Sequence, residues 1–442
     1  MTSPSRSYPR FPPEICDLFV GALDEWPPTE TQVRTLGACS LVSRSFAHSA
    51  RKHLFRHVLA GEWTPNTELD TLTTLYELVS WEPSSTQGGI PNIVRYIEEL
   101  SCCCDHILPA GLEAEQWDSI FSAILQCMHG SDYGIRTLSI VCNETWSELG
   151  LGFQHAFRDL LLSPHLTSLK MAMLWDLPKT LLVGSHLQHL SLRDCSVNES
   201  SKSIHSSSRY PNATALFPSL ESIEVDFSYM ALFESDSLAG NERSPSALSS
   251  LQTLHWNTHY APGRGDIVTF SSVQNTIEFL DITFGQYAGS MRPSVFDLAA
   301  MKNLKRLRIS DHRMENTAVF SPIIDIGLGD SKLLDWLQVP DTLELFELNH
   351  VLYLGEDVTS IDFLLDSFAT NQWSRLNQFF SSPNFAKVQK VVLNLNFARY
   401  MESVIPQDRA SFFGGIESLI RAAFPHFSGP NVSCVLSILV LA

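Results

Sequence analysis

The stretch LQHLSLRDC at residues 187–195 carries the pattern on which the fold depends: leucine at its first, fourth and sixth positions. The same pattern, with exchanges among apolar residues, recurs along most of the chain. Its ten copies begin at Ile97, Ile135, Leu166, Leu187, Leu220, Leu251, Ile277, Leu304, Leu343 and Val388. Alternate side chains of a strand point to one face, so the fourth and sixth positions would enter a common core. Each copy therefore predicts one short strand.

The copies start 21 to 45 residues apart, which leaves room for a return segment between successive strands. Apolar periodicity predicts helices in four of these segments, at residues 117–128, 153–162, 362–380 and 412–424. The C-terminal run VSCVLSILVLA is shorter than the roughly 20 apolar residues that a membrane-spanning helix needs, and it predicts a buried closing strand. We expect an α/β solenoid with parallel strands on its concave side and helices and loops on its convex side. An ordinary α/β sheet domain, which also alternates strands and helices, is the alternative.

The N-terminal segment has a helical pattern instead. In FPPEICDLFVGAL at residues 11–23, prolines precede Ile15, Leu18, Phe19 and Leu23, which recur at helical spacing. A polar loop follows, and VRTLGACSLVSRSFAHSARKHLFRHV then resumes the helical period as far as Val58. Two or three short helices are predicted. About fifty residues seldom form a stable core alone, so a partner or the following domain should complete this module.

Three short motifs of this segment, FPPEI, LGACSLVSRSF and HLFRHV, together resemble the F-box of fungal-type proteins, and the later repeats resemble irregular leucine-rich repeats. The resemblance implies an N-terminal module that docks on the Skp-family adaptor of a cullin-RING (SCF-type) ubiquitin ligase, and an array that holds a protein substrate. The adaptor contacts that it implies are Pro12, Pro13, Ile15, Leu18, Leu41, Val42, Ser43 and Phe46. Core packing is the alternative role of Ile15, Val42 and Phe46. A repeat scaffold whose N-terminal helices only cap the array is the alternative function.

Strand alternation also predicts where a substrate would bind. If the leucines face inward, the residues between and beside them line the concave surface. The predicted substrate-binding residues are Glu224, Asp226, His255, Asp281, Arg306 and Arg308. Their acidic residues give way to a basic pair, which would orient a partner of complementary charge. The alternative is that they are solvated polar positions on a sheet face.

The totals exclude several classes of function. The net charge of −18, without a run of Lys and Arg, disfavours nucleic acid and membranes as partners. The first ten residues hold no apolar segment of the kind that a secretory signal needs, so we expect an intracellular protein, cytoplasmic or nuclear. Motifs of hydrolases and of phosphate- or dinucleotide-binding loops are absent, so no catalytic or cofactor-binding residue is predicted. An enzyme with a site assembled from distant positions is the less favoured alternative.

Nine cysteines occur without any C-x-x-C pair, and neighbours in the triplet at residues 102–104 would point to opposite faces of a strand, so no metal site is predicted. The expected organisation is a disordered tail at 1–10, an F-box-like helical module at 11–60, a linker at 61–92 and the leucine-rich-repeat-like solenoid at 93–442.

Overall fold

The computed structural model describes residues 12–23, 30–60, 68–80, 92–104, 114–129, 134–178, 180–198, 219–226, 248–258, 273–284, 298–311, 339–352, 381, 385, 387–397, 414, 415, 418, 422 and 433–440. The expected N-terminal tail at 1–10 and the expected helix at 362–380 lie outside this set. The chain forms two compact units, and the boundary between them falls inside one strand, after Leu190. The first unit comprises residues 1–190 and 194–198, and the second comprises residues 191–193 and 199–442.

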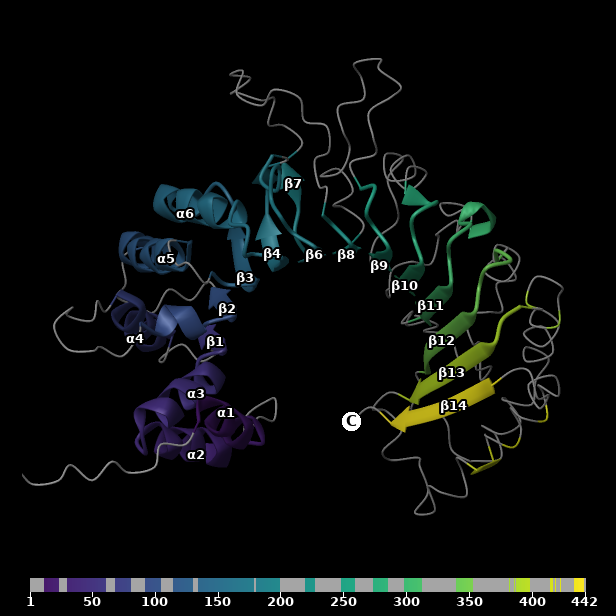
Figure 1. The fold of residues 1–442 in the computed structure, drawn as a ribbon. Helices are drawn as coiled ribbons and strands as arrows, with labels where there is room; N and C mark the ends of the chain where they lie inside the picture. Colours follow the sequence, from purple (N-terminus) through teal and green to yellow (C-terminus); the bar gives the residue numbers. More distant parts are fainter. Residues whose placement is uncertain are drawn as a thin grey trace, which may run out of the picture. The chain divides into compact units, whose positions relative to one another are not determined.

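The first unit contains all the long helices that are described. Its elements are α1 (Pro13–Gly21), α2 (Glu30–Ser40), α3 (Arg44–Leu54), β1 (His57–Ala60), α4 (Glu68–Ser80), the 3-10 helix η1 (Ile93–Tyr96), β2 (Glu99–Cys104), α5 (Ala114–His129), β3 (Thr137–Thr145), α6 (Leu151–Leu161), β4 (Ser168–Trp175), β5 (Leu177–Pro178) and β7 (Val197–Asn198). Strand β6 (His189–Arg193) is divided between the units, with residues 191–193 in the second. Strands β1 to β4 pair in chain order and in parallel, as Figure 1 shows. The short strands β5 and β7 form a separate parallel pair.

The second unit is built on parallel strands alone in its described part, apart from short helical turns. Its elements are β8 (Ser222–Asp226), β9 (Thr253–Thr258), β10 (Phe279–Phe284), the 3-10 helix η5 (Leu298–Ala300), β11 (Arg306–Asp311), β12 (Leu345–Leu352), β13 (Lys390–Phe397) and β14 (Ser433–Val440). Each strand from β8 to β14 pairs with the next in the chain. The protein is therefore a mixed α/β protein with extensive parallel sheet, and this strand order is consistent with a solenoid-like fold.

The ten repeats explain the positions of the strands. A strand begins two residues after the start of every copy, from β2 at Glu99 to β13 at Lys390. Fourth-position residues of neighbouring strands are register partners, as with Leu254, Leu280 and Leu307. All ten are at most 3% exposed, namely Leu100, Leu138, Leu169, Leu190, Ile223, Leu254, Leu280, Leu307, Phe346 and Val391. The repeated leucines thus form stacked rows in the core of each unit, and burying one such side chain contributes about 1.5–3 kcal/mol.

Two predicted return helices are confirmed, residues 117–128 within α5 and residues 153–162 largely within α6. These two helices share an aromatic cluster in which Phe153 stacks against Phe121 and Phe157. The Asp118 carboxylate on α5 accepts the backbone N–H of Phe153 at 2.8 Å and so caps the first turn of α6. Of the helix expected at 412–424, only residues 414, 415, 418 and 422 are described, and all four are helical. The predicted closing strand is present as β14, which pairs with β13, whereas the predicted burial of its side chains lies outside the described part of the structure.

The structure differs from the expected organisation between residues 55 and 92. The helical pattern was expected to reach Val58, but α3 ends at Leu54 and His57–Ala60 form β1, whose Val58 is the register partner of Leu100. Pairing with β2 satisfies the backbone of this segment, and such tertiary context overrides local periodicity. The expected linker at 61–92 contains α4, in which Leu72, Leu75 and Val79 are buried. Among the described helices, none is long and apolar enough to span a bilayer.

Candidate interaction surfaces

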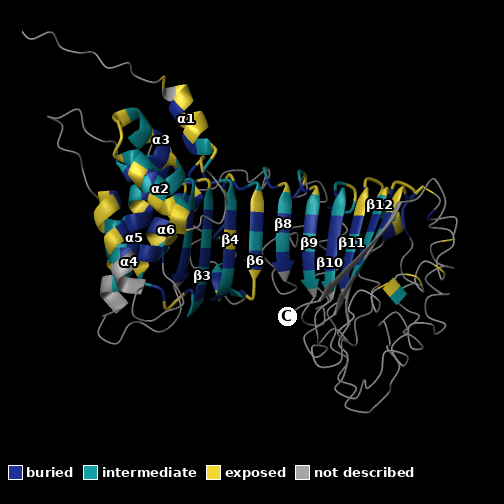
Figure 2. Ribbon diagram, turned by 90° about the horizontal axis from the view of Figure 1, so that it is seen from below, coloured by how far each residue is buried: buried dark blue, intermediate teal, exposed yellow. Residues whose placement is uncertain are grey.

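Helix α1 is apolar on opposite faces. Cys16 and Val20, four residues apart, are fully buried. On the other side of the helix, Ile15, Leu18 and Phe19 are 46, 72 and 60% exposed, and Figure 2 marks the exposed positions of α1 in yellow. A helix that is apolar all round is normally buried on all sides. Three residues of the stripe predicted from the sequence, Ile15, Leu18 and Phe19, lie at the surface, and the fourth, Leu23, is half-buried.

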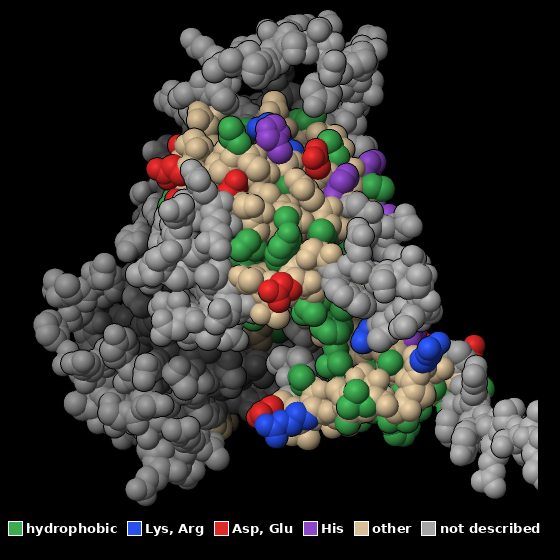
Figure 3. Space-filling view, turned by 90° about the vertical axis from the view of Figure 1, so that its left-hand side faces the viewer, with side chains coloured by type: hydrophobic (Ala, Val, Ile, Leu, Met, Phe, Trp, Pro, Cys, Tyr) green, Lys and Arg blue, Asp and Glu red, His purple; other side chains and the backbone are tan. Residues whose placement is uncertain are grey.

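The turn between α2 and α3 presents further apolar side chains. Leu41 is 87% exposed and Val42 is 69% exposed, while Val33 on α2 is also exposed. We call Ile15, Leu18, Phe19, Val33, Leu41 and Val42 the exposed apolar set of α1–α3. Figure 3 shows hydrophobic side chains at the surface of the first unit on the face that it draws.

Two further predicted adaptor contacts have structural roles of their own. The Ser43 hydroxyl accepts the backbone N–H of Phe46 at 3.3 Å and is the N-cap of α3. The Phe46 ring is half-buried and meets Phe19 edge to face, with 6.0 Å between ring centroids. Phe46 is thus partly covered by Phe19, a surface residue, whereas Ile15 and Val42 are exposed. Pro12 is exposed and is the N-cap residue of α1, and the side chain of Pro13 lies outside the described part of the structure.

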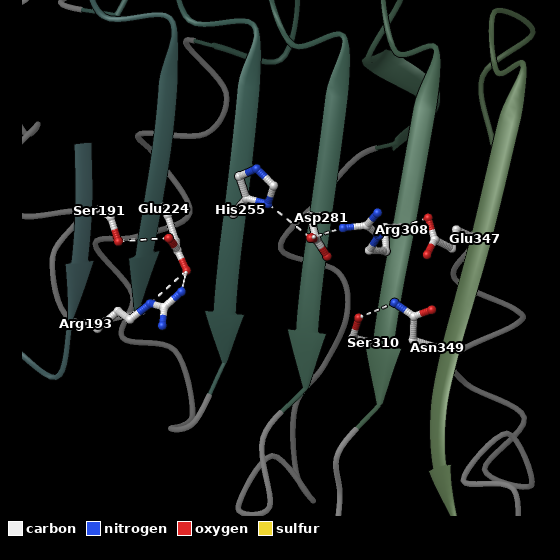
Figure 4. A network of polar contacts seen from close by, with 9 residues as sticks. All are labelled: Ser191, Arg193, Glu224, His255, Asp281, Arg308, Ser310, Glu347 and Asn349. Atoms are coloured by element: carbon white, nitrogen blue, oxygen red, sulfur yellow. Dashed lines mark hydrogen bonds and ion pairs between the residues drawn. The ribbon is translucent and has the colours of Figure 1, made fainter. Parts of the chain in front are cut away.

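In the second unit, the polar residues between the buried leucines pair with one another across the strands. The Glu224 carboxylate on β8 accepts hydrogen bonds from the Ser191 hydroxyl at 2.8 Å and from the Arg193 guanidinium at 2.6 and 2.9 Å (Figure 4). The predicted substrate residue Glu224 thus already has a cationic partner from its own chain. The side chain of Asp226 lies outside the described part of the structure.

A longer ion-pair chain crosses β9 to β12, because residues at the fifth repeat position are register partners. Asp281 Oδ2 lies 3.0 Å from His255 Nδ1 and 3.3 Å from Arg308 Nη1. Arg308 Nε lies 3.0 Å from Glu347 Oε2, as Figure 4 shows. The Asp281 side chain is only 12% exposed, and its Oδ1 atom is buried without a hydrogen-bond partner among the described residues. Asp281 is therefore the buried centre of a network whose other members, His255 and Arg308, are half-buried.

The pKa of Arg308 follows from this network. Burial alone would lower the pKa of the guanidinium, but hydrogen bonding and charge attraction from Glu347 and Asp281 outweigh it and raise the pKa above its ordinary value. Arg308 therefore stays charged.

Uncharged polar side chains at the seventh repeat position extend this hydrogen-bond network. Asn394 donates to Glu347 Oε1 at 3.0 Å and to Asn349 Oδ1 at 2.6 Å, and Asn349 donates to the Ser310 hydroxyl at 3.1 Å. The predicted substrate set omits these residues. The repeat pattern could have revealed them, because Ser310, Asn349 and Asn394 occupy one position of three successive copies.

Arg306 differs from Arg308 although it is only two residues away. Both guanidinium groups lie over the Phe279 ring, 4.7 Å from the centroid for Arg306 and 5.6 Å for Arg308, but the side chain of Arg306 is exposed whereas that of Arg308 is half-buried. His255 meets the same ring edge to face at 5.2 Å, which holds the ring from a second side. Arg306 is the one predicted substrate residue that combines a fixed position with an exposed charge in the described network.

Cys102 and Cys103 of the triplet on β2 are both buried, and the side chain of Cys104 lies outside the described part of the structure. Cys102 is fully buried, and burial, with a smaller contribution from neighbouring Cys103, raises the pKa of its thiol far above the ordinary value. This thiol stays protonated, whereas a metal ligand must be a thiolate. Within the described residues, no group of three or more His, Cys, Asp or Glu side chains could hold a metal ion.

Neither the known protein-family models nor the curated proteins yield a match to this chain.

Proposed function

We propose that this protein is a substrate-recognition adaptor of a cullin-RING ubiquitin ligase, in which α1–α3 dock on a Skp-family adaptor and the repeat strands of the second unit bind a protein substrate. The observation that carries the proposal is the exposed apolar set of α1–α3. Four of its members, Ile15, Leu18, Leu41 and Val42, are among the contacts that the F-box resemblance implies.

Six large apolar side chains are exposed within 28 residues of the chain. Exposed apolar surface of this kind is costly to leave in water, and contiguous apolar patches mark protein-binding sites. Covering them would contribute about 1.5–3 kcal/mol for each fully buried side chain. A docking partner explains why the second apolar face of α1 is retained. The chain itself would then supply binding surfaces and no chemistry.

A repeat scaffold capped by its N-terminal helices is the second candidate. One observation favours it: β1 follows α3 directly and pairs in parallel with β2, the first repeat strand, so the helical segment is joined to a strand that extends the sheet of the repeats. A cap, however, needs a polar outer face for solubility. Leu18 and Leu41 are apolar and are 72% and 87% exposed, so the outer face of these helices is not polar. Adaptor docking explains this exposed apolar surface, whereas a capping role does not.

The test uses the full chain and a purified Skp-family adaptor immobilised on a surface. Leu41→Asp should lower the affinity on the order of a hundredfold or more, because an unpaired carboxylate at an apolar interface costs several kcal/mol. Leu151→Asp is the matched control, since Leu151 on α6 is 71% exposed and lies outside α1–α3. It should retain wild-type affinity. Thermal unfolding should be unchanged in either variant. Absence of wild-type binding, or equal binding by Leu41→Asp, would contradict adaptor docking.

A further inference from the structure

The side chains at the third repeat position lie outside the ion-pair network, which is formed by residues at the fifth position. Across β10 to β13 its register partners are Phe279, Arg306, Leu345 and Lys390. We call these four residues the entry row, because they stand at the first residue of each strand. The row alternates apolar and cationic side chains and contains no acidic residue.

The carboxylates next to this row in the sequence interact with cations outside the row, namely Lys305 and Arg308. Glu278 pairs with Lys305 at 2.8 Å, and Glu344 adds to the charge attraction that, after the hydrogen bond from Glu278, raises the pKa of Lys305. Asp281 and Glu347 are paired with Arg308. Within the described residues, the side chains of Arg306 and Lys390 therefore have no carboxylate partner, although they are exposed on an acidic protein.

The position of the Arg306 side chain favours the binding of an anion. A guanidinium that stacks on a ring uses its flat face and leaves its N–H donors at the edge, in the fork that matches a carboxylate. The Phe279 ring supplies that stacking surface at 4.7 Å. Fixing the side chain before binding reduces the entropy that association must otherwise overcome.

We propose that the entry row binds an extended acidic segment of a partner protein, with one carboxylate on Arg306, a second on Lys390 and an apolar side chain over Leu345. This inference rests on the proposed function, in which the second unit holds a protein substrate, and it specifies the class of segment that is bound.

The spacing of the strands sets the spacing of the carboxylates. Arg306 and Lys390 stand two strands apart, or about 10 Å at 4.7–4.9 Å for each strand step. An extended segment crossing the strands advances about 3.3 Å per residue, so the two acidic residues should be about three positions apart. The residues between them meet Leu345, which favours an apolar side chain there.

Carboxylates fit this row better than phosphoryl groups. A protein of negative net charge repels a dianion more strongly than a monoanion. The protein as a whole carries −18. A planar carboxylate also matches the planar fork of Arg306 in a bidentate pair.

The experiment titrates the full chain with three synthetic peptides, monitored by fluorescence anisotropy of a label on the peptide. The first has two glutamates three positions apart with a leucine between them, the second replaces the glutamates by glutamines, and the third replaces them by phosphoserines. The glutamate peptide should bind at least about tenfold more tightly than the glutamine peptide, and its binding should weaken as salt is added. The phosphoserine peptide should bind no more tightly than the glutamate peptide.

The variants locate the binding site. Arg306→Gln should weaken binding of the glutamate peptide about tenfold or more, and Lys390→Gln about two- to threefold, because the lysine is an exposed point charge. Lys302→Gln is the matched control: it removes the same charge from an exposed position that precedes the repeat copy of Arg306, outside the entry row, and should leave affinity unchanged.

Three outcomes would overturn the proposal: no saturable binding of the glutamate peptide up to about 5 mM, equal binding of the glutamine peptide, or unchanged affinity in Arg306→Gln. Tighter binding of the phosphoserine peptide would assign the row to phosphorylated segments instead. Because adaptor docking is tested by Leu41→Asp on α1–α3, failure of one experiment leaves the result of the other intact.

Discussion

Apolar side chains of this chain occupy two contrasting kinds of position. In the repeats, Leu254, Leu280 and Leu307 are register partners on successive strands and are at most 1% exposed. In the N-terminal helices, Leu18 and Leu41 are mostly exposed. The residue type is the same, and the difference is whether a neighbouring element of the chain covers it. The contrast teaches that apolar periodicity identifies a surface to be buried, whereas the structure decides whether the chain itself or a partner buries it.

The largest expected effect tests this contrast with one substitution at two sites. Leu280→Ala should lower the free energy of unfolding by about 2–5 kcal/mol, because it leaves a cavity between two covered neighbours. Leu18→Ala should change it by less than about 0.5 kcal/mol, because the side chain is already in water. Urea unfolding of the two variants measures the difference. Similar losses at the two sites would mean that Leu18 is covered within the chain.

The contrast between covered and uncovered side chains extends to the two arginines of β11. Arg308→Glu should lower the free energy of unfolding by about 1–3 kcal/mol, since it removes the guanidinium and places a carboxylate between those of Asp281 and Glu347. Arg306→Glu should change stability by less than about 0.5 kcal/mol, because the side chain is exposed and only rests on Phe279.

Thermal unfolding at low and high salt measures the two charge reversals side by side. The deficit of Arg308→Glu should shrink as salt screens the repulsion, although partial burial of the network limits the screening. Equal stability of the two variants would indicate that the ion pairs of Arg308 contribute nothing to the fold.

The strands could be predicted from the sequence because every copy of the repeat has the same relation to its strand. Leu187 and Leu304 lie two residues before β6 and β11, as do the first residues of the other copies. The pattern fixes which side chains enter the core, since a shift by one residue would turn every leucine outward. It also placed His255 and Asp281 on the same face of neighbouring strands.

Other features depend on contacts that the local sequence does not contain. Strand β1 forms because β2 offers backbone partners to His57–Ala60, and α4 lies where a linker was expected because Leu72, Leu75 and Val79 find a core. The pairing of Arg308 with Asp281 and Glu347 joins residues 27 and 39 positions apart in the sequence. The exposure of Ile15 and Leu18 could not be predicted from the sequence either, because apolar residues at helical spacing have the same pattern whether they face a core or a partner.

The smallest expected effect separates the two roles of Ser43. Its hydroxyl caps α3, so Ser43→Ala should lower the free energy of unfolding by about 1 kcal/mol, whereas Ser43→Asp should retain most of the stability because aspartate caps equally well. If Ser43 acts only as a cap, Ser43→Asp should also retain affinity for the Skp-family adaptor. If it contacts the adaptor beside the exposed Leu41 and Val42, the added charge should weaken binding while stability is preserved. Thermal unfolding and adaptor binding, measured on the same two variants, therefore show whether the adaptor interface extends from the apolar turn onto the first turn of α3. A large loss of stability in Ser43→Asp would contradict the capping geometry itself.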